Sequence, residues 1–154
     1  MRRHRNPDDD LVVEESGIEL QKAFALLLPI RRQRLRRSER QQRQAEQALR
    51  DTVTQGERIE RALGEQQTHY LTLRDAFADR HMKGTQKQER LMQGLNQERS
   101  ACEAVAGHKN ALTQCQHQQR QRAEYLEQAQ RDTQARQRDL EKLEYMIQES
   151  EVLR

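Results

Sequence analysis

The sequence predicts an all-α fold, a long two-helix antiparallel coiled-coil hairpin, and three observations support this. Of the 154 residues, 34% are charged, 33% are hydrophobic and only 3% are aromatic, which is too little apolar material to fill a globular core. Uncharged residues recur at heptad spacing through the first half of the chain. Helix stop and start signals also lie next to each other near Gly84. We therefore expect one seam between two helices.

The N-terminal segment, residues 1–16, mixes basic and acidic blocks and is predicted to be a disordered tail. Ser16 and Glu19 have capping-box spacing, so the first helix is expected to start near Gly17. Pro29 disfavours helical geometry in the residue before it. Two possibilities stay open there, a kink in one helix and a break followed by a new helix.

A heptad lattice begins at Leu35 and advances by alternating steps of three and four residues. It has thirteen positions, and none is charged in a chain where one residue in three is. Such a pattern is typical of a coiled-coil seam and argues against disorder. The positions are Leu35, Ser38, Gln42, Ala45, Leu49, Thr52, Gly56, Ile59, Leu63, Gln66, Tyr70, Leu73 and Phe77.

The second arm is predicted to follow a tight turn. Gly84 suits the end of a helix, and Thr85 with Gln88 has capping-box spacing again. The coiled-coil hairpin, residues 17–154, then comprises a first arm of about 17–82, a turn at about 83–85 and a second arm of about 86–152.

Two seven-residue series are predicted to form the seam of the second arm. One runs through Leu91, Glu98, Val105, Leu112, Gln119, Leu126, Thr133, Leu140 and Ile147. The other runs through Leu95, Cys102, Lys109, Gln116, Ala123, Gln130, Gln137 and Glu144. Folding the chain about residue 84 pairs Phe77 with Leu91 and Ala45 with Ala123. Large apolar residues are densest near the turn, so we expect the turn end to be the better packed one.

A basic cluster follows Pro29. Guanidinium groups bind carboxylates bidentately, so the cluster is interpreted as a docking face for an acidic protein surface. A solvated helix face is one alternative. A basic helix that binds nucleic acid is another, although the predicted turn would end its zipper-like stretch. The cluster holds one Glu and seven arginines: Arg31, Arg32, Arg34, Arg36, Arg37, Arg40 and Arg43.

Near the turn, large side chains gather in a chain that has few of them. They pack the two arms together in one interpretation and contact a second partner in the other, because flexible thioethers suit adaptable surfaces. These residues are Tyr70, Leu73, Phe77, Met82 and Met92.

Nothing in the sequence indicates an active site. The five histidines and two cysteines form no metal-binding or catalytic constellation, and there is no Gly-rich phosphate loop. We expect no catalytic activity, no cofactor, no bound metal and no nucleic-acid partner. No apolar run is long enough for a membrane span, so membrane insertion is not expected either.

Over residues 28–46 the sequence resembles the small stalk proteins of bacterial type III secretion systems, the YscO/FliJ-like family. These proteins open with an apolar and basic helix of the form L-x-x-I-[RK]-x-x-R-x-x-R-[AS]-E. The residues that match this pattern are Ile30, Arg31, Arg34, Arg37, Ser38 and Glu39.

The resemblance implies a central-stalk protein in the cytoplasm, peripheral to the secretion apparatus at the inner membrane. Its open end, with the seven arginines, would dock in the hexameric secretion ATPase. Its tip would face the cytoplasmic domain of the export gate or bind secretion chaperones. Two other functions remain open, a generic coiled-coil scaffold or tether and a nucleic-acid-binding hairpin. The oligomeric state of the free protein is left open as well.

Overall fold

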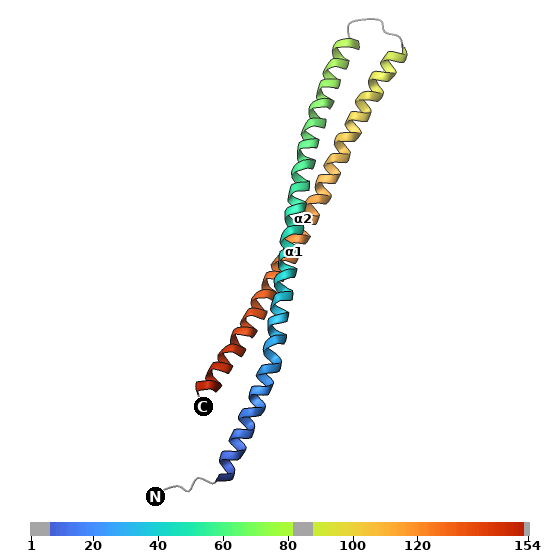
Figure 1. Ribbon diagram of the computed structural model, residues 1–154. Coiled ribbons are helices and arrows are strands. Elements are labelled where there is room, and N and C mark those ends of the chain that lie inside the picture. The colour runs from blue at the N-terminus through green and yellow to red at the C-terminus, as the bar shows by residue number, and fades with distance from the viewer. Residues whose placement is uncertain (1–6, 82–87, 153–154) are drawn as a thin grey trace. The chain divides into compact units, whose positions relative to one another are not determined.

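The computed structural model describes residues 7–81 and 88–152, and every one of them is α-helical. Helix α1 is Pro7–His81 and helix α2 is Gln88–Val152. Figure 1 shows the two helices running in opposite directions along the chain. The predicted all-α antiparallel hairpin is therefore confirmed, while the predicted turn at 83–85 lies outside the described residues.

Helix α1 differs from the prediction at its start and at Pro29. It begins at Pro7, so residues 7–16 of the predicted disordered tail are helical instead. A proline is well tolerated in the first turn because its missing N–H would have no helical acceptor there. Pro29 lies inside the continuous helix, so of the two possibilities left open, the break followed by a new helix does not occur. Only one backbone hydrogen bond is lost at Pro29.

The chain divides into two compact units. Unit 1 consists of Met1–Ala45 and Tyr125–Arg154, and unit 2 consists of Glu46–Glu124. Each unit contains one segment of α1 and one segment of α2. The seam of each unit is described separately below.

The seam of α1 follows the predicted lattice. All thirteen lattice positions are buried or half-buried. In unit 1 the same alternation of steps extends towards the N-terminus through Gln21, Phe24, Leu28 and Arg31, which are all half-buried. The pattern passes Pro29 without a change of phase, so the helix presents the same face to α2 before and after this proline.

The seam of α2 agrees with one predicted series and contradicts the other. The series from Glu98 to Ile147 is half-buried at every member, and Leu91 is 38% exposed. Every member of the series that starts at Leu95 is exposed, Ala123 included, so the pairing of Ala45 with Ala123 is wrong.

The second series of α2 lies one residue earlier than predicted. Its buried or half-buried members are Gly94, Ala101, His108, Cys115, Ala129, Leu143 and Ser150. Most of these side chains are small, which weakens their hydrophobic signal in the sequence. Small side chains also let two helices approach closely, and this explains why they occupy the seam.

The buried core is small and is not concentrated at the turn end. Its hydrophobic members are Ala45, Ala101, Cys115, Ala129 and Leu143, and Ser38 and Thr52 are buried beside them. Leu143 in unit 1 and Thr52 in unit 2 are fully buried. Within the described part of residues 57–100, no side chain is buried. The expectation that the turn end is better packed is therefore wrong.

Neither helix, over its described length, contains a stretch that is both apolar and long enough to cross a lipid bilayer.

Candidate functional site

The seven arginines of the basic cluster all lie on α1 in unit 1, but they do not share one environment. Arg31 is half-buried in the seam, and its Nη1 donates a hydrogen bond of 2.6 Å to the backbone carbonyl of Asp139 on α2. The other six are exposed. Arg31 therefore joins the two helices of unit 1, while the remaining guanidinium groups face solvent.

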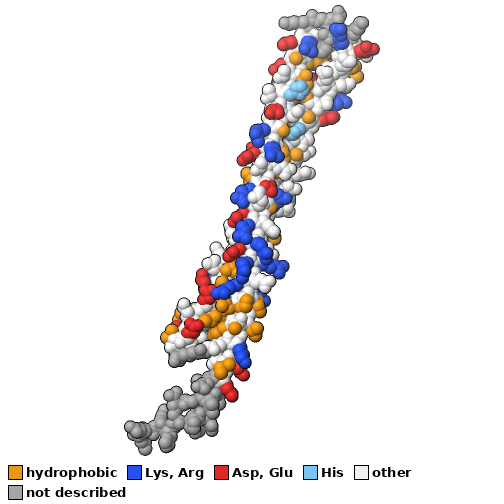
Figure 2. All heavy atoms as spheres, viewed as in Figure 1, with side chains coloured by type: hydrophobic (Ala, Val, Ile, Leu, Met, Phe, Trp, Pro, Cys, Tyr) orange, Lys and Arg blue, Asp and Glu red, His pale blue; other side chains and the backbone are white. Residues whose placement is uncertain are grey.

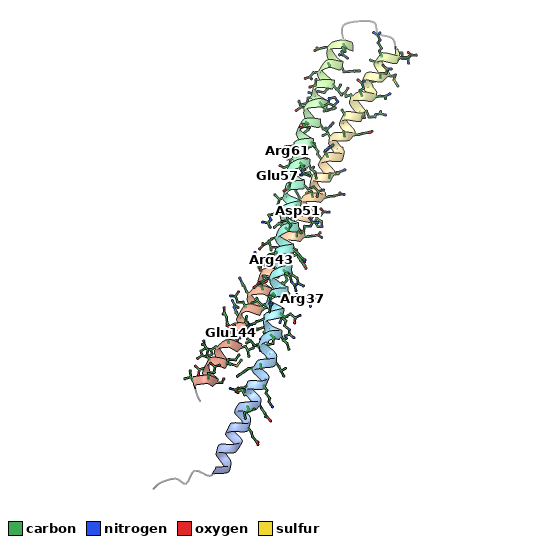
Figure 3. The ribbon with its side chains drawn as sticks, in the orientation of Figure 1. Arg37, Arg43, Asp51, Glu57, Arg61 and Glu144 are labelled. Atoms are coloured by element: carbon green, nitrogen blue, oxygen red, sulfur yellow. The ribbon has the colours of Figure 1, made fainter. Side chains whose placement is uncertain are left out.

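Three of the exposed arginines, Arg36, Arg40 and Arg43, line one groove along α1. Pro29, Gln33 and Glu39 complete this shallow, open groove, whose volume is about 510 Å³. Steps of four and three residues place the three arginines on one face of the helix. We call this surface the arginine groove. The ribbon and side chains around Arg37 and Arg43 are shown in Figure 3.

A second basic site lies where α1 and α2 meet in unit 1. Arg31 and Arg34 from α1 line a small cavity of about 140 Å³ together with Arg136 and Asp139 from α2. Arg136 Nη1 lies 4.0 Å from a carboxylate oxygen of Asp139. Three arginines and one aspartate therefore line this cavity, which leaves it with an excess of positive charge.

Neither of the ion pairs described in unit 1 joins the basic cluster to a carboxylate of α2. Arg131 pairs with Glu127 at 3.4 Å and Arg136 with Asp139 at 4.0 Å, and both pairs lie within α2. Glu144 is exposed and projects from α2 in Figure 3. Both pairs involve only α2 side chains, so they do not occupy the exposed arginines of α1.

A layer of polar groups crosses the seam in unit 2. The Thr52 hydroxyl donates to the carbonyl of Ala48 at 2.8 Å. Arg122 Nη1 on α2 donates to the same carbonyl at 3.0 Å and also to the Thr52 hydroxyl. The fully buried hydroxyl of Thr52 is thus satisfied as donor and as acceptor, as a buried polar group requires.

The same layer continues to the carbonyl of Thr52. Cys115 Sγ and Gln119 Nε2 both donate to it, each at 3.4 Å. Gly56, one turn along α1, leaves room for these side chains, since a Cβ built there would lie 2.8 Å from Gln119 Nε2. We call these residues the Thr52 layer. Their contacts match only one alignment of α1 against α2, and such layers specify register in coiled coils.

The sequence identified part of the Thr52 layer and missed the rest. Thr52, Gly56 and Gln119 were predicted at seam positions, as the structure shows. Cys115 and Arg122 belong to the seven-residue series that lies one residue before the predicted one. The recurrence of small residues at Ala101, Cys115 and Ala129 is the signal that marks this series.

The residues predicted for the tip are only partly brought together. Tyr70, Leu73 and Phe77 are half-buried on α1, and Met92 on α2 is 52% exposed. Leu73 lines a hollow of about 400 Å³ in unit 2, with Gln66, His69, Gln97, Ser100, Ala101 and Ala104. Met82 lies outside the described residues.

The part of the chain that the structure describes contains no group of three or more His, Cys, Asp or Glu side chains that could hold a metal ion. The most developed candidate site is therefore the basic face of unit 1. A comparison with protein-family models, curated proteins and solved structures finds no match to the chain.

Proposed function

We propose that the protein is a central-stalk component of a bacterial type III secretion export apparatus. The observation that carries this proposal is the exposed basic face of α1, which contains Arg34 and Arg37, two of the three arginines that match the YscO/FliJ-like motif. An antiparallel pair of helices with one basic end suits a part that docks by that end. In this proposal the protein works in the cytoplasm, peripheral to the apparatus at the inner membrane.

The basic face of unit 1 would dock against acidic loops of the hexameric secretion ATPase. Arginine is suited to this role because its planar guanidinium group binds a carboxylate through two parallel hydrogen bonds. The arginine groove offers Arg36, Arg40 and Arg43 to one set of acidic side chains, and Arg34 and Arg37 are exposed to another. Arg31 is engaged with Asp139, so it would hold unit 1 together and contribute less to docking.

The tip residues Tyr70, Leu73, Phe77, Met82 and Met92 would contact the cytoplasmic domain of the export gate or secretion chaperones. Partial exposure of large apolar side chains supports this part of the proposal, since Met92 is 52% exposed and Leu91 is 38% exposed. Thioether and leucine side chains suit a surface that binds more than one partner.

Charge reversal tests the docking step. The double variant Arg34→Glu/Arg37→Glu should abolish copurification with the secretion ATPase of the native cell. A matched control is Arg58→Glu/Arg61→Glu, which reverses two exposed arginines of α1 in unit 2 and should leave copurification unchanged. If the first variant still copurifies as the unaltered protein does, the ATPase assignment is wrong.

A scaffold or tether is the second candidate function, and the exposed apolar side chains of both units favour it. Leu26, Leu71, Tyr125 and Tyr145 are between 45% and 69% exposed, which is suited to contact with other proteins. A scaffold would not stimulate ATP hydrolysis when added to a purified secretion ATPase, whereas a stalk that docks in the ring should. This assay, with mass spectrometry of the captured partners, separates the two functions.

A further inference from the structure

Helix α1 has a second apolar face in unit 1 that α2 does not cover. The seam face contains Phe24 and Leu28, which are half-buried. The second face contains Leu26, Leu27 and Ile30, which are 69%, 39% and 44% exposed. Figure 2 shows apolar side chains gathered on the surface of unit 1, next to Lys and Arg side chains.

The exposed residues form one continuous stripe along α1. Ala23, Leu26, Leu27 and Ile30 follow the spacing i, i+3, i+4, i+7, which is the pattern of a helix that buries one face against a partner. We call them the outer stripe. A lone exposed leucine needs no explanation, but a stripe at helical spacing predicts a partner helix.

Opposite charges flank the two ends of the outer stripe. Glu15 and Glu19 precede it on the same face of α1, and Arg34 and Arg37 follow it. All four side chains are exposed. From the N-terminal to the C-terminal side, this face of α1 is therefore acidic, then apolar, then basic.

When two copies of this helix run antiparallel, the acidic end of each stripe lies beside the basic end of the other. In an antiparallel pair of identical helices centred between residues 26 and 27, Glu19 of one copy lies opposite Arg34 of the other. Ala23 then lies opposite Ile30, so a small side chain faces a large one. A parallel pair would instead place like charges together at both ends, at a cost similar to the gain from opposite charges.

We propose that the outer stripe binds a second copy of this chain, with the two α1 helices antiparallel about a twofold axis. Such an interface is isologous, so each contact occurs twice and the assembly closes at two copies. A surface of one charge sign, protein or lipid, would attract one end of the stripe and repel the other. Only a partner with the reversed order of charge satisfies both ends, and the chain itself has that order.

The dimer goes beyond the proposed function and does not depend on it. Its consequence for that function is competition, because Arg34 and Arg37 would face Glu19 and Glu15 of the second copy in the dimer. A dimer would then keep these arginines from an acidic partner until the two copies separate.

Sedimentation velocity of the purified full-length protein tests the proposal, from about 1 µM to about 1 mM. The mass should rise with concentration from 18.3 kDa towards twice that value and no further. The variant Leu26→Glu should raise the dimer dissociation constant at least about 100-fold, because it buries a charge twice in a symmetric interface. A control, Ile18→Glu, changes a 52% exposed residue on another face of α1 and should leave the constant unchanged.

A charge swap tests the antiparallel pairing. Glu19→Arg and Arg34→Glu should each weaken the dimer about tenfold, since each affects two symmetric ion pairs. The double variant should return to within about threefold of the original constant. Arg32→Glu reverses an exposed arginine outside the stripe and is the control for the single changes.

Four results overturn the proposal. They are a protein that stays monomeric over the whole concentration range, a larger oligomer, a dimer that tolerates Leu26→Glu, and a double charge swap that fails to restore the dimer. Far-UV circular dichroism of each variant checks that helix content is preserved, so a loss of dimer cannot be confused with unfolding.

Discussion

Replacing Gly56 by Ala tests the Thr52 layer directly. A glycine inside a helix costs about 1 kcal/mol relative to alanine, so the substitution should stabilise the protein by that amount if nothing else changes. A Cβ at position 56 would, however, lie 2.8 Å from Gln119 Nε2. The Gln119 amide must move, and it then gives up its 3.4 Å hydrogen bond to the Thr52 carbonyl. A net hydrogen bond contributes roughly 0.5–1.5 kcal/mol, so we expect a net effect between a gain and a loss of about 0.5 kcal/mol.

Gly64→Ala is the matched control, because a Cβ there meets nothing within 4 Å. It should give the full stabilisation of about 1 kcal/mol in urea unfolding followed by far-UV circular dichroism. In a Gln119→Ala background the obstacle at Gly56 is absent, and Gly56→Ala should then stabilise as much as Gly64→Ala does. If Gly56→Ala and Gly64→Ala stabilise the unaltered chain equally, the close contact between Gly56 and Gln119 is refuted.

Three further predictions concern stability and access. Leu143→Ala should lower the free energy of unfolding by about 2–4 kcal/mol, because Leu143 is fully buried. The control Leu71→Ala changes a residue that is 45% exposed and should lower it by less than about 1 kcal/mol, as measured by urea unfolding of both variants. Pro29→Ala should raise the same free energy by about 1–3 kcal/mol, because it restores a hydrogen bond inside α1, and an unchanged urea midpoint would contradict this. Cys102 is exposed and should react quickly with a thiol reagent, whereas Cys115 is buried and should react only when the two helices separate. Equal reaction rates of the two thiols in the folded protein would show that the seam is open at Cys115.

The seam of α1 was predictable because its signal repeats many times. Thirteen uncharged positions at heptad spacing leave one face of the helix without charge, and the structure buries or half-buries all of them. The sequence left open whether Pro29 kinks or breaks the helix; α1 continues through it, and the same spacing continues through Phe24 and Leu28 on its N-terminal side. Burial along the whole face outweighs the loss of one hydrogen bond.

The candidate site was predictable in composition but not in arrangement. Seven arginines in one stretch are visible in the sequence, and six of them are exposed in the structure. Their division into the arginine groove and the cavity beside Asp139 depends on where α2 lies next to α1. The engagement of Arg31 with the backbone of Asp139 follows from the same placement.

The sequence by itself determined that this protein is a pair of helices with a polar, narrow seam. Periodicity is a property of one chain segment, so it can be read without knowing the partner. Only the tertiary structure decided which second series of α2 faces the seam. The buried residues are Cys115 and Leu143, and the residues that follow them, Gln116 and Glu144, are exposed. Residues three and four positions away from a seam residue lie on the same side of a helix, so either could complete the seam. Which of them is buried depends on the surface that α1 presents to α2.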